Sequence, residues 1–384
     1  MTQALALAAF LREAGHDVHR VLVGRSPWRS VPEYFTSGIG APVEAFDAPT
    51  QVPDSSREGV SALGTGLDLV RRGGRFVRSV RQIGRALNDA DVVVNFLDLL
   101  GGVALGMSAR RVPALAVAHN HLFLHPDLAG APGPTAVRRL VLGYAQATAT
   151  GTVRKLALSF GPMSGPAPSG LSVTPPLLRP GLADLKACDD GFLLAYALNA
   201  GYGRQLAAWQ RRNPNVTVHC FVDGGPGALG MPDAGPKPQA DAGPKPQADV
   251  GPGALADGGP GAFQAHDLDD RSFLDHLARC RAFVGSAGFE SICEAHYLGK
   301  PTLAVPTRGQ FEQVLNAWDA ERCGAARSGT YADLDPFWRA TTPPAADVVQ
   351  AFRAWVGRGP EIFVDAVERT AHHERSNTPV GDRI

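Results

Sequence analysis

The sequence has few cysteines, few lysines and no long hydrophobic run. Its five cysteines are scattered, and no two have the C-x-x-C spacing of a zinc site. Separated thiols in odd number do not form a disulfide framework and fit a reducing compartment. No run of about 18 apolar residues is present, and no basic segment precedes an apolar stretch at the N-terminus. We therefore predict neither a membrane span nor a signal peptide, and expect a cytoplasmic protein.

Net charge is also lacking. Lys and Arg total 37, and Asp and Glu total 37, which argues against a protein that coats nucleic acid, because such domains are basic. Glycine and proline are abundant instead, with 44 and 31 residues, above the background of roughly 12% for the pair. Hydrophobic residues still make up 44% of the 384 residues. That is enough for two domains, each with a core of its own.

Part of the glycine and proline lies in an eight-residue repeat. The unit DAGPKPQA occurs twice between Asp233 and Ala248, and related units follow. These units carry almost no large apolar side chains and cannot bury a core. We predict that residues 224–262 are a disordered insertion between two strands, at 216–222 and 263–268. The alternative interpretation is a proline-rich ligand for another protein.

Helical segments alternate with short apolar runs rich in β-branched residues, which predicts a parallel α/β fold. The pattern runs through the first half, restarts at about residue 192, and is interrupted by a proline-dense segment at 162–180 that suits a linker. Two Rossmann-like domains that face each other across a cleft are the simplest architecture that accounts for this repeated pattern. The predicted division is a first domain at 1–161, a linker at 162–190, a second domain at 191–370 and a flexible tail at 371–384.

The most informative segment spans residues 285–317. A predicted strand ends there, and Ser286, Ala287 and Gly288 form a small-residue turn that lets a ligand approach the backbone. A helix is expected to begin at Phe289, so its unpaired N–H groups and the positive end of its dipole face the ligand side. Such a helix start suits a pyrophosphate.

Carboxylates and amides follow on this helix and the next. Glu294 lies one turn beyond Glu290, where a carboxylate can accept hydrogen bonds from two ribose hydroxyls. Glu290 itself favours the helix dipole but repels phosphate unless it points away. The next predicted strand is followed by Gln310, Glu312, Gln313 and Asn316. Polar groups at the carboxyl end of a strand are where α/β folds bind ligands. Taken singly these residues also fit solvated helix faces and caps; taken together they favour a nucleotide site.

This segment resembles the donor-binding motif of GT-B glycosyltransferases. The similarity is to the group, family 28, that includes the lipid-linked N-acetylglucosaminyltransferase of peptidoglycan synthesis. It rests on Gly288, on Glu294 six residues later, on Gly299-Lys300-Pro301, and on Gln313 with Asn316-Ala317. The form GQFEQ-x-x-NA is similar to that of a less characterised branch of the group. The resemblance implies a GT-B fold and a glycosyltransferase, with residues 1–161 on the acceptor side and residues 191–370 binding the nucleotide sugar.

The resemblance also implies roles for individual residues. Ser286, Ala287, Gly288 and Phe289 would hold the diphosphate, and Glu294 the ribose. Gln310 and Gln313 would touch the donor sugar, and Asn316 belongs to the same donor site. The donor would be a nucleotide-diphosphate sugar, with a UDP-sugar favoured, and no metal or other cofactor is expected.

The N-terminal half departs from the pattern of this group, whose members open with a strand and a glycine-rich loop that ends in Gly-His. This chain opens with MTQALALAAFLREAGHDV, which resembles the helix that follows that loop. The first strand and loop are therefore expected to be missing. Either the start was assigned too far downstream, or the chain is truncated.

With that loop missing, His119 is the best remaining candidate for a catalytic base. It follows the apolar run at 114–118, and an imidazole at the end of a strand can act as a general base near neutral pH. Asn120 and His121 beside it, and Asn95 after an earlier strand, would lie on the acceptor side. The alternative is that these histidines only shape the loop and that Asn95 serves as a cap in a turn.

Arginines mark one face of a helix expected at residues 67–88. Arg71, Arg75, Arg78 and Arg85 share that face. A basic helix can dock on anionic lipid headgroups, which suits a lipid-linked acceptor on the inner face of a membrane. Against this, Gly73-Gly74 is expected to break the helix and its apolar face is thin. The arginines are either a solvated surface or a peripheral membrane contact.

The predicted reaction is transfer of a sugar from a nucleotide-diphosphate sugar to an acceptor that the sequence does not identify, with a lipid-linked or cell-envelope acceptor as one candidate. A histidine would deprotonate the acceptor hydroxyl, and the helix after Gly288 would stabilise the leaving diphosphate. Two alternatives stay open. A nucleotide-sugar 2-epimerase would need further acids and bases, for which only Glu290 and Glu312 are candidates. A non-catalytic nucleotide-sugar-binding protein is the other.

Overall fold

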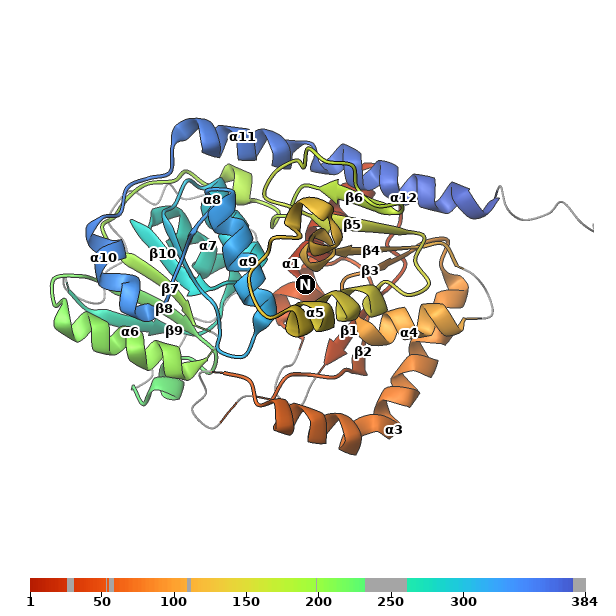
Figure 1. Cartoon of the computed structure of the whole chain (residues 1–384), viewed down its shortest axis with the longest axis horizontal. Coiled ribbons are helices and arrows are strands. Elements are labelled where there is room, and N and C mark those ends of the chain that lie inside the picture. The colour runs from red at the N-terminus through yellow and green to blue at the C-terminus, as the bar shows by residue number, and fades with distance from the viewer. Residues whose placement is uncertain are drawn as a thin grey trace, which may run out of the picture.

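Parallel β-sheets flanked by helices form both halves of the chain (Figure 1). The computed structural model describes residues 1–25, 31–52, 54, 59–108, 112–197, 199–231 and 261–375. The predicted α/β class is confirmed. Within the described residues, no helix has both the length and the apolarity needed to cross a bilayer.

The second half is built on one six-stranded sheet with the order β12-β11-β10-β7-β8-β9. All its neighbouring strands are parallel, and β8, β10 and β11 are buried along their whole length. Near-continuous burial explains why they read as apolar runs rather than as alternating patterns. The strands are β7 (Leu193–Ala197), β8 (Val218–Val222), β9 (Phe263–His266), β10 (Ala282–Ser286), β11 (Thr302–Val305) and β12 (Arg327–Ser328).

Helices cover both faces of this sheet, as crossover connections between parallel strands require. One face packs against Tyr202, Leu206 and Trp209 of α6, and the other against Phe273 and Leu277 of α7. The helices of this half are α6 (Ala200–Arg212), α7 (Asp270–Arg279), α8 (Phe289–Tyr297), α9 (Phe311–Arg322), α10 (Leu334–Arg339) and α11 (Ala346–Gly357).

The first half contains two separate sheets within its described residues. One pairs β1 (Val21–Arg25) with β2 (Val43–Asp47), and the other has the order β3-β4-β5-β6. The second of these is also parallel and centres on β4, which is fully buried. Its strands are β3 (Val93–Asn95), β4 (Ala114–Ala118), β5 (Arg154–Leu158) and β6 (Leu171–Thr174). The helices of this half are α1 (Thr2–Glu13), α2 (Glu33–Gly38), α3 (Ala62–Ala86), α4 (Leu99–Met107) and α5 (Thr135–Thr148).

The structure differs from the sequence prediction at the linker and at the end of the chain. Residues 162–190, predicted as a linker, contain β6, which pairs with β5 as an ordinary sheet strand. The final helix, α12 (Gly359–Arg375), was assigned to the second domain and tail, but it packs on α1 and on the sheet of the first half (Figure 1). The chain thus crosses back after α11, because the apolar side of α12 completes the first core.

Two further differences concern α3 and the predicted insertion. The α3 helix runs unbroken through Gly73-Gly74, since two glycines weaken a helix without necessarily ending it. Of the predicted insertion, residues 232–260 lie outside the described residues. Its first part is placed on the domain: Pro226–Leu229 forms a 3-10 turn, and Leu229 packs against the core under α6.

A large hydrophobic cluster contains residues of both halves. It includes Val117 and Leu158 from the first sheet, Phe289 and Ile292 from α8, and Phe363 from α12. Burial of about 25 cal/mol per Å² of apolar surface across this junction holds the two halves in one arrangement.

Candidate active site

A cleft of about 1170 Å³ lies where the two halves face each other. The second half contributes the starts of α8 and α9, and the first half contributes the end of β4, part of α5 and the start of α1. The carboxyl ends of the central parallel strands β4 and β10 therefore open onto the same space, where α/β folds bind ligands.

The small-residue turn at the end of β10 is held by hydrogen bonds. Gly288 lies at the N-cap of α8, and its N–H donates to the Ser286 carbonyl at 2.6 Å. The Asn316 side chain donates from Nδ2 to the Ala287 carbonyl at 3.0 Å. Gly288, Phe289 and Asn316 line the cleft, whereas Ser286 and Ala287 lie beneath the turn. The predicted small-residue turn is thus present, with Gly288 and Phe289 on the surface of the cleft.

A second helix begins beside this turn. The Thr2 hydroxyl at the start of α1 donates to Glu290 Oε2 at 2.6 Å. Because α1 and α8 both begin at the cleft, two positive dipole ends converge there. Glu290 lines the cleft and does not point away from it. It places a negative charge close to where a phosphate would lie.

The amide side chains after β11 bond to one another. Gln313 Nε2 donates to Gln310 Oε1 at 2.6 Å, and Gln313 Oε1 accepts from the Thr307 N–H at 2.8 Å. Both glutamines line the cleft, together with Phe311 and Glu312 from the same turn of α9. Their hydrogen bonds fix the loop between β11 and α9, so these side chains reach the cleft in one defined arrangement.

Glu294 lies elsewhere. Its side chain is 1% exposed and is absent from the cleft lining. Both carboxylate oxygens are held by Arg179, with Nε–Oε1 at 2.7 Å and Nη2–Oε2 at 2.8 Å. Arg179 also lies over the ring of Phe273 at 5.4 Å. The structure therefore does not bring the predicted ribose-binding residue to the cleft. The missing information was the bidentate partner, which comes from a segment 115 positions earlier.

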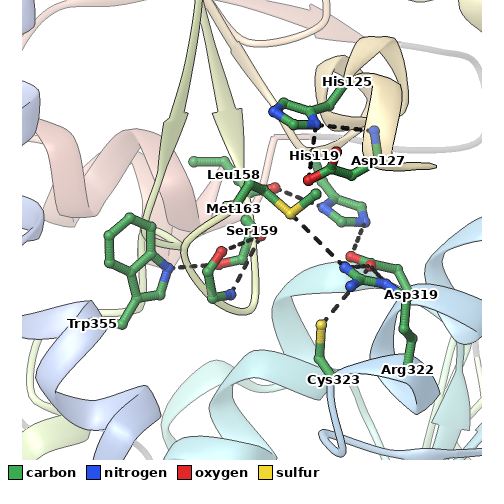
Figure 2. Close-up of polar contacts among 11 residues, drawn as sticks. His119, His125, Asp127, Leu158, Ser159, Met163, Asp319, Arg322, Cys323 and Trp355 are labelled. Carbon is green, nitrogen blue, oxygen red and sulfur yellow. Dashed lines mark hydrogen bonds and ion pairs between the residues drawn. The ribbon is translucent and has the colours of Figure 1, made fainter. Parts of the chain in front are cut away.

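His119 reaches the bottom of the cleft with its ring held on several sides. Its Nδ1 lies 2.8 Å from the Leu158 carbonyl, and its Nε2 lies 3.7 Å from Oδ2 of buried Asp319 (Figure 2). The ring stacks on Phe289 at 4.0 Å. A carbonyl only accepts, so Nδ1 carries the proton and Nε2 faces Asp319 rather than open space. Burial lowers the pKa of His119, and the Asp319 charge opposes this only in part.

The His119 ring thus forms part of a contact between the two halves. Arg322 donates from Nε and Nη2 to Asp319 Oδ1, at 3.1 and 2.7 Å, and its Nη2 lies 4.0 Å from the Met163 sulfur (Figure 2). This contact joins β4, the loop after β5 and helix α9. Its geometry suits positioning of the loop better than proton transfer to a ligand.

The other acceptor-side predictions separate into two groups. Asn120 lines the cleft, while His121 and Asn95 do not. His121 is fully buried, and burial together with nearby Lys155 lowers its pKa to about 4. Asn95 donates to the Thr148 and Asp98 carbonyls and accepts from the Asp98 N–H. Asn95 therefore caps a turn, as the alternative interpretation of the sequence proposed.

Several lining residues were not singled out from the sequence. Asn199 and Asp223 follow β7 and β8, so the rule that ligands bind at the carboxyl ends of strands could have found them. Glu312 was predicted as one of the polar groups after β11 and as an acid or base of the epimerase alternative, but not as the base of sugar transfer. Burial raises its pKa against a smaller lowering by the amide of Asn120. From the first half, residues 49–52 and Asp54 close one side of the cleft, and Arg308 donates to Asp54 at 2.8 Å.

Comparisons with known proteins agree with this layout. Residues 254–338 match the family model described as glycosyl transferase family 1, a range that contains α8, β11, α9 and the small-residue turn. No curated protein sequence matches the chain significantly.

Solved structures match over nearly the whole chain. The glycotransferase of kitacinnamycin has 17% identity and a TM-score of 0.57, with 96% of this chain and 95% of that chain covered. Arabidopsis thaliana UGT89C1, complexed with UDP-L-rhamnose, has 12% identity and a TM-score of 0.55, with 98% and 95% covered. Acinetobacter baumannii MurG has 15% identity and a TM-score of 0.49, with 96% and 95% covered. These likenesses show that the chain has the GT-B fold, and the match to a glycosyltransferase family model lies within its second half.

Proposed function

We propose that the cleft binds a nucleotide-diphosphate sugar and transfers its sugar to an acceptor hydroxyl. The observation that carries this proposal is the convergence of two helix N-termini, of α1 and α8, on one cleft between the halves. Backbone N–H groups and two dipole ends attract the diphosphate there and stabilise it as a leaving group, against the repulsion of the Glu290 carboxylate that also lines the cleft. Gly288 lets the phosphates approach, because a side chain at the helix N-cap would stand between them and the N–H groups.

The nucleoside lies toward Asn199 and Asp223, past the ends of β7 and β8. Asp223 offers a carboxylate to ribose hydroxyls, a role that does not suit Glu294, which is buried against Arg179 and does not line the cleft. Gln310 and Glu312, in the first turn of α9, face the donor sugar. A UDP-sugar is the favoured donor, a choice consistent with the UDP-L-rhamnose in the Arabidopsis relative.

Glu312 is the better candidate for the catalytic base. Its carboxylate lines the cleft and its burial raises its pKa toward the working range of a general base. Tyr144 and Asn120 from the first half also line the cleft, so an acceptor hydroxyl entering from that half meets Glu312 on the opposite wall. His119, whose Nε2 faces Asp319, positions the β4 loop instead.

A glycosyltransferase with a membrane-borne acceptor would need a docking face, and α3 provides one. Arg71, Arg75 and Arg78 are exposed. Apolar side chains are exposed on the same helix: Leu63, Leu67, Leu69, Val70 and Val77. Exposed apolar side chains interleaved with arginines are the pattern of a helix that lies in an anionic bilayer surface. We propose that α3 makes this peripheral contact. In vesicle co-sedimentation, replacing the three arginines by Glu should abolish binding to anionic vesicles, and unchanged binding would contradict the role.

The donor site is tested by thermal shift with UDP-, GDP- and dTDP-sugars. One nucleotide series should raise Tm, and stabilisation by none of them would overturn the proposal. Release of nucleoside diphosphate from the stabilising sugar, with water as the slow acceptor, then tests the base. Glu312→Gln should lower this rate about 10²–10⁴-fold and leave nucleotide binding unchanged. Conversion of the donor to its 2-epimer without acceptor would point to the epimerase instead.

A further inference from the structure

Three histidine side chains meet in the second half, away from the cleft. His219 lies on β8, His266 on β9 and His276 on α7. Their candidate ligand nitrogens all lie within 4.8 Å of one another, and none of the three lines the cleft. The cluster therefore needs an explanation other than donor or acceptor binding.

The spacing of the nitrogens suits a shared ion. His219 Nδ1 and His266 Nε2 are 3.0 Å apart. Two nitrogens bound to one tetrahedral zinc at 2.0–2.1 Å lie roughly 3.3 Å apart, so only a small rotation of the rings is required. His276 lies over both partners, with ring centroids 4.7 Å from His219 and 5.1 Å from His266.

His276 is held in the tautomer of a metal ligand. Its Nδ1 lies 2.7 Å from the Ser272 carbonyl, which can only accept, so Nδ1 carries the proton. The lone pair is then on Nε2, which is buried and has no hydrogen-bond partner. The whole side chain is 5% exposed. A ring that donates one N–H to a backbone carbonyl and aims the other nitrogen into a cluster has the second partner typical of metal-bound histidine.

The surroundings keep the three rings neutral. Burial lowers the pKa of His219 to about 3 and that of His266 to about 4, and it lowers the pKa of His276. The rings pack against Phe192 and Phe221. Neutral imidazole is the ligating form, so the cluster need not lose a net proton. The proton in the hydrogen bond between His219 Nδ1 and His266 Nε2 must move to the other nitrogen of its ring before both nitrogens bind the ion.

Charged groups near the cluster are balanced. Arg279, whose charge acts on His219 and His276, is paired with Asp190 at 2.6 Å and with Asp275 at 3.8 Å. Asp267 follows His266 and favours positive charge there. A divalent cation at the cluster therefore does not face an unbalanced positive charge.

We propose that His219, His266 and His276 bind one Zn²⁺ ion, with water as the fourth ligand. Three imidazoles are a known zinc ligand set, and neutral nitrogen donors favour Zn²⁺ over Mg²⁺ or Ca²⁺. The ion would fasten β8, β9 and α7 together. The strands β8 and β9 are neighbours in the sheet although residues 223–262 separate them in the chain, and closing so long a segment carries an entropic cost that a metal clip offsets.

The experiment uses the full chain without an affinity tag, stripped with EDTA and equilibrated with Zn²⁺. Equilibrium dialysis with metal analysis should give one Zn²⁺ per chain, and saturation should raise Tm by roughly 5 °C or more. Replacing Zn²⁺ by Co²⁺ should give the visible absorption of tetrahedral cobalt. No bound Zn²⁺ at micromolar free metal would overturn the proposal and leave a simple cluster of hydrogen-bonded rings.

Variants place the ion at the cluster. His266→Gln, at the half-buried position, and His276→Gln should each lower zinc affinity at least about 10-fold. His296→Gln is the matched control, because His296 is a buried histidine of the same half outside the cluster. Retention of wild-type zinc affinity in both cluster variants would overturn the proposal even if wild type binds Zn²⁺. Nucleotide affinity is measured in parallel and does not depend on this outcome.

Discussion

The two halves of this chain both contain parallel sheets, but they differ in how the sheets and the two sides of the cleft are built. The second half has one continuous sheet of six parallel strands, while the described residues of the first half form a two-stranded and a four-stranded sheet. The second half's side of the cleft is built from side chains held by internal hydrogen bonds, such as those of Gln310, Gln313 and Asn316. The first half's side is built from the start of α1 with Gln3, the segment after β4 with Asn120, the loop residues 49–52 and the face of α5 that carries Tyr144.

This difference indicates a division of labour. A wall whose side chains are fixed by internal hydrogen bonds is suited to one constant ligand, because preorganised groups do not need to be ordered on binding. A wall made of helix ends and loops tolerates variation. We therefore expect donor binding to be carried by the second half, with the acceptor entering from the first. The predictions below test this asymmetry in order of decreasing effect.

The largest effect is expected at the pair that ties the linker to α8. Arg179→Ala should lower the free energy of unfolding by about 3–5 kcal/mol, because it leaves the Glu294 carboxylate buried and unpaired. Urea denaturation measures the loss. Arg339→Ala is the control, since its exposed pair with Asp335 should contribute well under 1 kcal/mol. Equal losses in the two variants would show that the buried pair does not hold the second half to the linker.

The next effect compares buried histidines of the two halves under acid. The folded-state pKa values of His121 and His296 are both lowered to about 4 from 6.5. Their neutral forms therefore stabilise the fold fully above about pH 6.5, and this contribution is lost as the pH falls toward 4, by about 3 kcal/mol for each residue. His121→Gln and His296→Gln should each flatten the pH dependence of unfolding. If one variant kept the wild-type pH dependence of unfolding, the buried histidine of that half would not contribute to acid destabilisation.

A smaller effect is expected from a methyl group at the phosphate turn. Gly288 has a φ of −74°, and an added Cβ would meet no atom closer than 3.7 Å, so Gly288→Ala should fold normally. It should weaken diphosphate binding by about 10-fold, or 1.4 kcal/mol, by standing between the phosphates and the start of α8. Calorimetric titration measures this. Gly357→Ala, which also has open space around it, is the control. Normal nucleotide affinity in the Gly288 variant would show that the start of α8 does not bind the phosphates.

Much of the second half was predictable because its strands are short, buried and separated by caps. The strands β8 and β9 lie within the segments predicted at 216–222 and 263–268, and α8 begins at Phe289 as predicted. The failures share a cause, which is dependence on contacts far apart in the chain. Proline density at 162–180 favoured a linker, but pairing with β5 makes Leu171–Thr174 a strand. The same limit applies to Glu294. A glutamate at this position suits ribose binding, but its pairing with Arg179 keeps it away from the cleft. It also applies to His119, because Asp319 and Leu158 set the orientation of its ring.

The most direct test of the cleft assignment compares nucleoside diphosphates with the matching monophosphates. Titration calorimetry is run with UDP against UMP, GDP against GMP and dTDP against dTMP. If the converging starts of α1 and α8 hold the second phosphate, the diphosphate of the preferred base should bind at least about 10-fold more tightly than its monophosphate. Equal affinity within every pair, or no binding by any diphosphate, would contradict the assignment.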